Sequence, residues 1–313
     1  TYVFKHALVQ DAAYESMLKS KRQQLHQRIA QVLEVQFPDI VEHRPELVAH
    51  HYTEARLNNL AVPYWSQAGQ GAIRRAAFAE ALNHLSKGME LLGTLPESPH
   101  RDRQELDFQS ALGLVLQTLK GYAAPEVDYA YTRARSLCQQ VGDTAQLVSV
   151  LRGQLLFYGV RADYGVALEL GQQMLAVAER KRELEYQVEA HLAMGLVRLY
   201  QGELLWARTH LEQGIALDAP TSPSRQAFHY LGHSRAMSLA YLGRTLWLLG
   251  YPDQALQRSQ EGLALAHTLA IPMTVSQAQG MHTLLHQVRR EIDDTREWAE
   301  KTILSATEHG FPY

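Results

Sequence analysis

Small residues return at fixed intervals along this chain, and this spacing constrains the fold more than any other feature. A glycine is followed by an alanine 12 residues later and by a second glycine 7 residues after that, in three places. The copies are Gly69, Ala81 and Gly88; Gly195, Ala207 and Gly214; and Gly243, Ala255 and Gly262. Two antiparallel helices approach to roughly 8 to 10 Å only where small residues stand at the crossing. The spacing therefore predicts helix pairs packed in series, with these residues at the contacts.

The hydrophobic pattern between these positions is helical. Leu25, Ile29, Val32 and Leu33 follow the spacing of an amphipathic helix, and Phe4, Leu8 and Ala12 lie on one stripe of a helix before it. No stretch alternates with period two. Prolines stand where helices should begin, at Pro45, Pro125, Pro252 and Pro272. We expect an all-α fold.

The repeat itself resembles the tetratricopeptide pattern W-x2-L-G-x2-Y followed by A-x3-F. Trp65, Ala68, Gly69 and Ala72 stand for the first part, and Ala81 with Leu85 for the second. Weaker copies run over 114–138, 155–174 and 279–303, and breaker-rich stretches at 93–101 and 218–225 predict long loops. The resemblance implies a right-handed superhelical solenoid of about six or seven helix pairs.

Composition excludes several classes of function. The formal net charge is −3 and the basic residues are dispersed, so we expect neither nucleic acid nor an anionic membrane surface as a partner. The only cysteine, Cys138, excludes an internal disulfide and a thiolate zinc cluster, and we expect it to be an inert buried thiol. No apolar run reaches the roughly 20 residues of a spanning helix. We expect a cytoplasmic protein.

The first 75 residues carry a more specific resemblance. The segments "YVFKHALVQDAAYESMLKSKRQQLHQRIAQVLE", "PELVAHHYTEA" and "AVPYWSQAGQGAIRRA" resemble the region that joins ATPase module and helical repeats in bacterial STAND-type ATPase regulators. The likeness is greatest to large proteins with a class III adenylate/guanylate cyclase domain, an AAA-like ATPase and tetratricopeptide repeats. Later segments such as "ARTHLEQGIAL" and "LWLLGYPDQALQRS" resemble that family's repeats.

This resemblance implies a division into 1–60, a helical linker after an ATPase module, and 61–313, the repeats. The chain begins at Thr1 without a methionine, and the segment around Pro312 aligns with that around Pro272, which opens a helix, so we expect a piece of a longer protein that ends where another repeat would start. No Walker A loop, G-x4-G-K-S/T, is present, so only a regulatory role is carried over. We assign no catalytic, cofactor-binding or metal-binding residue and expect the chain not to be an enzyme by itself.

Three groups of ionisable residues are candidates for metal-binding or catalytic sites. Asp293, Asp294 and Glu297 echo an aspartate-rich Mg²⁺ motif, but acidic residues at a helix start suit the helix dipole better. The pairs His282/His286 and His229/His233 have i, i+4 spacing without a glutamate or an evident third ligand, which favours packing or surface histidines. His50 and His51 are about 100° apart on a helix, so we expect one to pack and one to be exposed.

Aromatic residues concentrate in the second half of the chain. Most should be core, and the candidates for a concave binding groove are Tyr158, Tyr200, Tyr230, Tyr241 and Trp247. Lys19, Lys21, Arg22 and Arg28 are candidates for contact with an upstream module, although a charged outer face is the simpler interpretation.

The leading hypothesis is a module that binds a protein, a peptide or a small effector and signals occupancy to an upstream ATPase or cyclase. Two alternatives remain open. An enzyme on an α/α scaffold requires carboxylates that converge in a deep pocket, and a self-associating scaffold requires a mass that depends on concentration.

Overall fold

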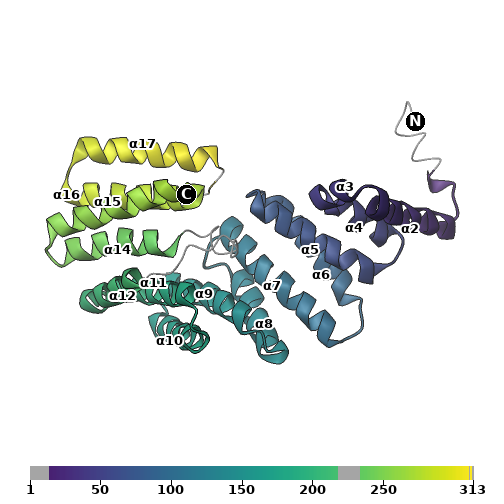
Figure 1. The fold of residues 1–313 in the computed structure, drawn as a ribbon, viewed down its shortest axis with the longest axis horizontal. Coiled ribbons are helices and arrows are strands. Elements are labelled where there is room, and N and C mark those ends of the chain that lie inside the picture. The colour runs from purple at the N-terminus through teal and green to yellow at the C-terminus, as the bar shows by residue number, and fades with distance from the viewer. Residues whose placement is uncertain (1–13, 218–232, 310, 312–313) are drawn as a thin grey trace. The chain divides into compact units, whose positions relative to one another are not determined.

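The structure is a computed structural model that describes residues 14–217, 233–309 and 311. The predicted stripe of Phe4, Leu8 and Ala12, the predicted loop at 218–225, His229 and Tyr230 lie outside the described residues. Every regular element of the described part is helical, which confirms the all-α fold class, of the solenoid type (Figure 1). None of the described helices is long and apolar enough to cross a membrane.

The chain divides into two compact units, residues 1–115 and 116–313, and each is described by itself. The first contains α2 (Lys19–Gln36), α3 (Pro38–His43), α4 (Pro45–Glu54), α5 (Asn58–Arg74), α6 (Phe78–Gly93) and most of α7 (Pro99–Lys120). Here α4 packs on α2 and α5, and α5 packs on α6. The division at residue 60, which the resemblance implies, stays a prediction.

The second unit contains α8 (Pro125–Val141), α9 (Thr144–Val160), α10 (Tyr164–Lys181), α11 (Leu184–Gln201), α12 (Leu204–Ala216), α14 (Ser234–Leu248), α15 (Pro252–Leu269), α16 (Pro272–Arg289) and α17 (Ile292–Glu308). The consecutive helices pack in pairs, α9 with α10, α11 with α12, α14 with α15 and α16 with α17. The first helices of neighbouring pairs also touch, because α11 contacts both α9 and α14, and α14 contacts α16.

Helix starts follow the proline positions. Pro45, Pro125, Pro252 and Pro272 each occupy the first turn of a helix, as the sequence predicted. The loop predicted over 93–101 is shorter than expected, since α6 ends at Gly93 and α7 begins at Pro99. Pro99 caused this difference: read as a breaker, it instead starts the helix.

The first glycine and the alanine of each triplet lie at a helix crossing. A methyl group on Gly69 would lie 2.5 Å from Leu85 Cδ2, and one on Gly195 would lie 2.8 Å from Leu211 Cγ. On Gly243 it would lie 2.9 Å from the carbonyl oxygen of Ala255. The alanines Ala81, Ala207 and Ala255 have no exposed surface. Each pair is therefore in close contact where the sequence places two small residues.

The second glycines face different neighbours. Gly88 is covered by Phe108 of the following helix α7, and Gly214 lies between His191 of α11 and Ser238 of α14. Gly262 instead faces the backbone of α14, the partner within its own pair. The third small residue thus admits the following helix in two of the three copies.

Candidate functional site

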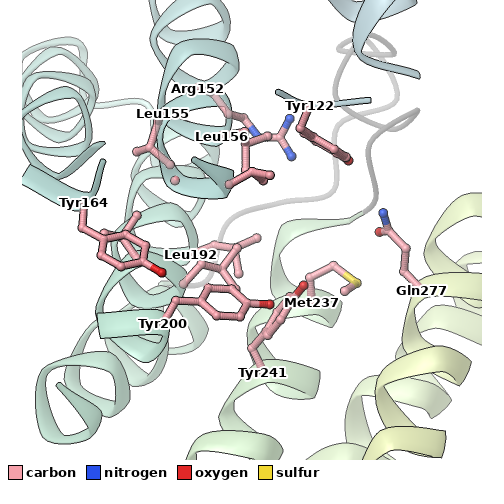
Figure 2. A pocket seen from close by; sticks show the side chains of 14 residues that line it. Tyr122, Arg152, Leu155, Leu156, Tyr164, Leu192, Tyr200, Met237, Tyr241 and Gln277 are labelled. Carbon is pink, nitrogen blue, oxygen red and sulfur yellow. The ribbon is translucent and has the colours of Figure 1, made fainter. Parts of the chain in front are cut away.

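A pocket of about 440 Å³ opens in the second unit, along the first helices of successive pairs (Figure 2). Its walls come from α9, α11, α14 and α16, together with the loop before α8 and the start of α10. The lining residues are Tyr122, Arg152, Leu155, Leu156, Gly159, Val160, Tyr164, Leu192, Leu196, Val197, Tyr200, Met237, Tyr241 and Gln277. A volume between roughly 300 and 1,000 Å³ is typical of ligand sites.

The floor of the pocket is apolar and rigid. Leu155, Leu192, Val197 and Met237 are almost fully buried, and they belong to the hydrophobic core between the pairs. Because core side chains hold single rotamers in a close-packed interior, this part of the surface is already formed without a ligand.

Four tyrosines supply the polar part of the lining. Figure 2 shows Tyr122, Tyr164, Tyr200 and Tyr241 around the space. Tyr200 has 52% of its surface exposed, and the guanidinium of Arg244 lies 5.7 Å from its ring centre. A tyrosine offers a large apolar face and a hydroxyl at little entropic cost, so such a lining suits side-chain recognition.

Among the lining residues that the structure describes, the only cation, Arg152, forms an ion pair with a buried carboxylate. Arg152 Nε lies 2.6 Å from Glu189 Oε2, and the side chains of the two residues are 11% and 5% exposed. Ser234 Oγ donates a hydrogen bond to the other oxygen of Glu189. This contact joins α9, α11 and α14 beneath the pocket. A buried pair of this kind fixes geometry, and it leaves the pocket close to neutral.

Gln277 brings the only amide side chain among the lining residues that the structure describes. Its Oε1 is buried and accepts no hydrogen bond from the residues that the structure describes. Since buried acceptors are nearly always paired, an N–H group of a bound molecule is a natural partner for this oxygen.

The structure separates the five predicted groove residues. Tyr200 and Tyr241 line the pocket, whereas Tyr158 and Trp247 do not, and Tyr230 lies outside the described residues. The Tyr158 hydroxyl donates to Asp128 Oδ1 at 3.4 Å, and burial, with Asp128 beside it, raises the pKa of Tyr158. Trp247 packs on the core, with the Arg289 guanidinium 5.8 Å from its ring. These two residues do not face the space that the other two share.

The acidic motif and the cysteine agree with their simpler interpretations. Asp293 and Asp294 lie in the first turn of α17, and Glu297 pairs with Lys301 at 2.5 Å. Cys138 is buried in α8. The acidic residues therefore sit where a helix dipole favours them.

His282 and His286 lack the glutamate of an H-E-x-x-H motif, but Glu291 lies beside His286 in the structure. His286 Nδ1 lies 2.6 Å from Glu291 Oε2, and the Nε2 atoms of the two histidines are 3.0 Å apart. His282 Nδ1 lies 2.7 Å from Ser259 Oγ, and burial, followed by His286, lowers the pKa of His282 to about 4. Each ring nitrogen therefore has a partner, and the two buried histidines form a packing network.

No family model matches this chain. The protein "Uncharacterized protein R02095" of Rhizobium meliloti (strain 1021) is 24% identical over 278 residues, which are 86% of this chain and 27% of that protein. The chain thus spans about a quarter of the length of the curated relative it matches.

Two solved structures are similar in fold. One is the STAND protein PH0952 of Pyrococcus horikoshii, which has a tetratricopeptide repeat sensor (TM-score 0.53, 11% identity, 93% of this chain and 42% of that one). The other is NprR in complex with its cognate peptide NprX (TM-score 0.59, 10% identity, 95% of this chain and 80% of that one). At this identity the likeness concerns the fold, and it shows that the chain is built of tetratricopeptide-like helix pairs.

Proposed function

We propose that this chain is a regulatory recognition module that binds a peptide or a protein segment in the pocket of the second unit. The observation that carries this proposal is the position of the pocket, on the first helices of four successive pairs. Successive first helices of a helical repeat present one continuous surface, which is the surface that such proteins use for extended partners.

The chemistry of the pocket favours an uncharged, partly aromatic or aliphatic segment. Its floor is apolar, its one cation is paired with Glu189, and its polar groups are the tyrosine hydroxyls and the Gln277 amide. Tyrosine hydroxyls and an amide can hydrogen-bond the peptide backbone while the floor takes a side chain. A strongly charged partner would find no free counter-charge among the described residues of this lining.

The parent protein is a larger signalling ATPase or nucleotidyl cyclase in this proposal. Support comes from the resemblance of the first 75 residues, from the PH0952 fold and from the greater length of the Rhizobium relative. Residues 1–60 would then transmit occupancy to the upstream ATPase or cyclase in the cytoplasm, and no membrane or nucleic-acid partner is proposed. NprR, solved with its peptide, provides a precedent for a peptide as effector.

An α/α enzyme remains the alternative, and the pocket gives it little support. None of the 14 lining residues is Asp, Glu, His, Ser or Cys. Acid–base or nucleophilic catalysis needs such groups within about 3 Å of a substrate atom. Sustained nucleotide hydrolysis by the purified chain would contradict the proposal. A mass that rises with protein concentration in light scattering would also contradict it and would favour a self-associating scaffold.

Peptide selection tests the proposal directly. A phage-displayed library of random peptides is selected on the purified chain, and the affinity of the selected peptide is measured by fluorescence polarisation. Tyr200→Ala and Gln277→Ala should each weaken binding tenfold or more, because each removes a contact of the lining. Trp206→Ala is the matched control. Trp206 belongs to α12, is 57% exposed and lies outside the lining, so the affinity of this variant should stay within twofold of the wild type.

Two results would contradict peptide recognition at this pocket. One is a selection that yields no peptide binding more tightly than the millimolar range. The other is a peptide whose affinity is unchanged in Tyr200→Ala and Gln277→Ala, or is lost in Trp206→Ala, since that peptide would bind elsewhere.

A further inference from the structure

Three imidazole rings meet in the first unit, at the contact between α2 and α4. His26 belongs to α2, and His50 and His51 are adjacent in α4. The Nδ1 atoms of His26 and His51 are 2.8 Å apart, and the ring centres of His26 and His50 are 5.9 Å apart. One ring nitrogen from each of the three lies within 4.8 Å of the others.

The facing helix explains how two adjacent histidines share one centre. Within α4 alone, adjacent side chains point about 100° apart and do not easily bind one ion together. His26 of the other helix lies near both rings, with its ring centre 5.0 Å from that of His51. His51 is half-buried and His50 is exposed, as expected, and the three rings still converge.

A tyrosine fixes the orientation of the buried member. The Tyr14 hydroxyl lies 2.8 Å from His26 Nε2. Histidines that ligate metals usually donate their second N–H to a fixed partner, which directs the remaining lone pair at the ion. With Nε2–H donated to the Tyr14 oxygen, the Nδ1 lone pair of His26 points at His51 and is available to a ligand.

Negative charge lies close to the imidazole cluster. Glu54, one turn beyond His50 on α4, acts electrostatically on both rings and supplies negative charge nearby.

We propose that His26, His50 and His51 form a binding site for a divalent transition-metal ion of the Zn²⁺ class, which clamps α2 to α4. Imidazole nitrogens suit Zn²⁺, Cu²⁺, Ni²⁺ and Co²⁺, whereas Mg²⁺ and Ca²⁺ prefer oxygen ligands. Three nitrogens leave a fourth position for water on the exposed side of His50. Tetrahedral bonds of about 2.0 to 2.1 Å place ligand nitrogens roughly 3.3 Å apart. The His26–His51 separation would lengthen by about 0.5 Å and the His50 ring would move inward.

The simpler explanation, a hydrogen bond between two histidines, accounts for His26 and His51 only. His50 makes no hydrogen bond within the described part of the chain, and its ring still lies beside the other two. In the buried network around His282, by contrast, each ring nitrogen has a hydrogen-bonding partner. The cluster of His26, His50 and His51 therefore keeps a ring without a hydrogen-bonding partner among the described residues, and this ring is accessible from solvent.

Metal titration of the full chain tests the site. After treatment with a chelator, the protein is titrated with ZnCl₂ by calorimetry and with CoCl₂ by visible absorption. We expect one equivalent of either metal, the absorption bands of tetrahedral Co²⁺, and a melting temperature that rises with Zn²⁺ concentration. His50→Ala should weaken binding at least tenfold, and Tyr14→Phe should weaken it 10- to 100-fold through the His26 orientation.

Controls separate the site from folding defects. His50 is exposed, so His50→Ala should keep the melting temperature of the metal-free protein, even if His26→Gln or His51→Gln impairs folding. His43→Ala removes an exposed histidine of α3 and should leave the affinity unchanged. The proposal is overturned if the protein binds no equivalent of Zn²⁺ or Co²⁺, or if His50→Ala binds either ion as tightly as the wild type.

Discussion

Gly243→Ala should destabilise the second unit, although alanine is the better helix former. The added methyl group would lie 2.9 Å from the carbonyl oxygen of Ala255 and 3.2 Å from the backbone nitrogen of Ser259. Both atoms belong to the backbone of α15, so no side-chain rotation relieves the contact. The two helices must instead separate by several tenths of an ångström at their crossing, which loosens the buried contacts around Leu242.

The magnitude follows from two opposing effects. Replacing glycine by alanine within a helix contributes about 1 kcal/mol of stability. Overpacking a close contact costs about 1 to 3 kcal/mol, and a contact with backbone belongs at the upper end of that range. The free energy of unfolding should therefore fall by about 2 kcal/mol.

Gly280→Ala in α16 is the matched control. The nearest atom to its added methyl group would be Thr302 Cγ2 at 3.7 Å, an ordinary van der Waals contact. Only the helix-forming term applies there, so stability should rise by up to about 1 kcal/mol.

Urea unfolding of the full chain, followed by circular dichroism and tryptophan fluorescence, measures both variants. Because the chain has two compact units, the unfolding transition of the second unit should be analysed separately from that of the first. Packing at the crossing would not explain the spacing of small residues if Gly243→Ala were as stable as the wild type. The same conclusion would follow if both variants shifted stability in the same direction.

Two further predictions concern charged and titratable groups of the second unit. Glu189→Ala should lower the free energy of unfolding by about 3 kcal/mol, because Arg152 is left as an unpaired, mostly buried charge. In urea unfolding, an Arg152→Met/Glu189→Leu double variant should recover most of this loss. Equal instability of the single and the double variant would contradict the prediction. Burial, as the largest cause, lowers the pKa of His210 and of His282 to about 4, below the unfolded value near 6.5. The unfolded chain then binds more protons between these values, so stability is complete above about pH 6.5 and falls as the pH is lowered towards 4. After allowance for solvent screening, thermal unfolding should show that the free energy of unfolding falls by roughly 1 kcal/mol per histidine from pH 7 to pH 5. His210→Gln should make this dependence of stability on pH weaker. The same pH dependence in His210→Gln and in the wild type would contradict the prediction.

The fold could be predicted because its determinants are local or periodic. A glycine or alanine at a crossing is required by the approach of two backbones, so its interval along the chain reports the length of the helix pair. Proline at Pro252 or Pro272 marks a helix start through its fixed φ angle and missing N–H. These constraints act within about 20 residues, and a single sequence displays them.

The candidate site was only partly predictable, because the face that a side chain occupies depends on the rotation of each helix against its neighbours. Tyr200 and Tyr158 are both tyrosines on first helices, yet only Tyr200 lines the pocket, while Tyr158 turns to Asp128. Glu189 gave no signal, since a carboxylate within a helix normally faces water. Its burial depends on Arg152, 37 positions earlier, and such a pairing follows from the stacking of pairs rather than from a local pattern.

The helices that pack against Gly214 are also helices that line the pocket. A methyl group added to Gly214 would lie 3.2 Å from His191 Cβ and 3.7 Å from Ser238 Oγ. The absence of a side chain at Gly214 therefore influences how closely α12 approaches α11 and α14. Those two helices also supply Leu192, Tyr200, Met237 and Tyr241 to the pocket. The width of the pocket is therefore linked to a contact on its far side. A partner that wedges into or fills the pocket would in turn press on that contact, which gives a helical repeat a physical route from occupancy to a change in packing between its pairs.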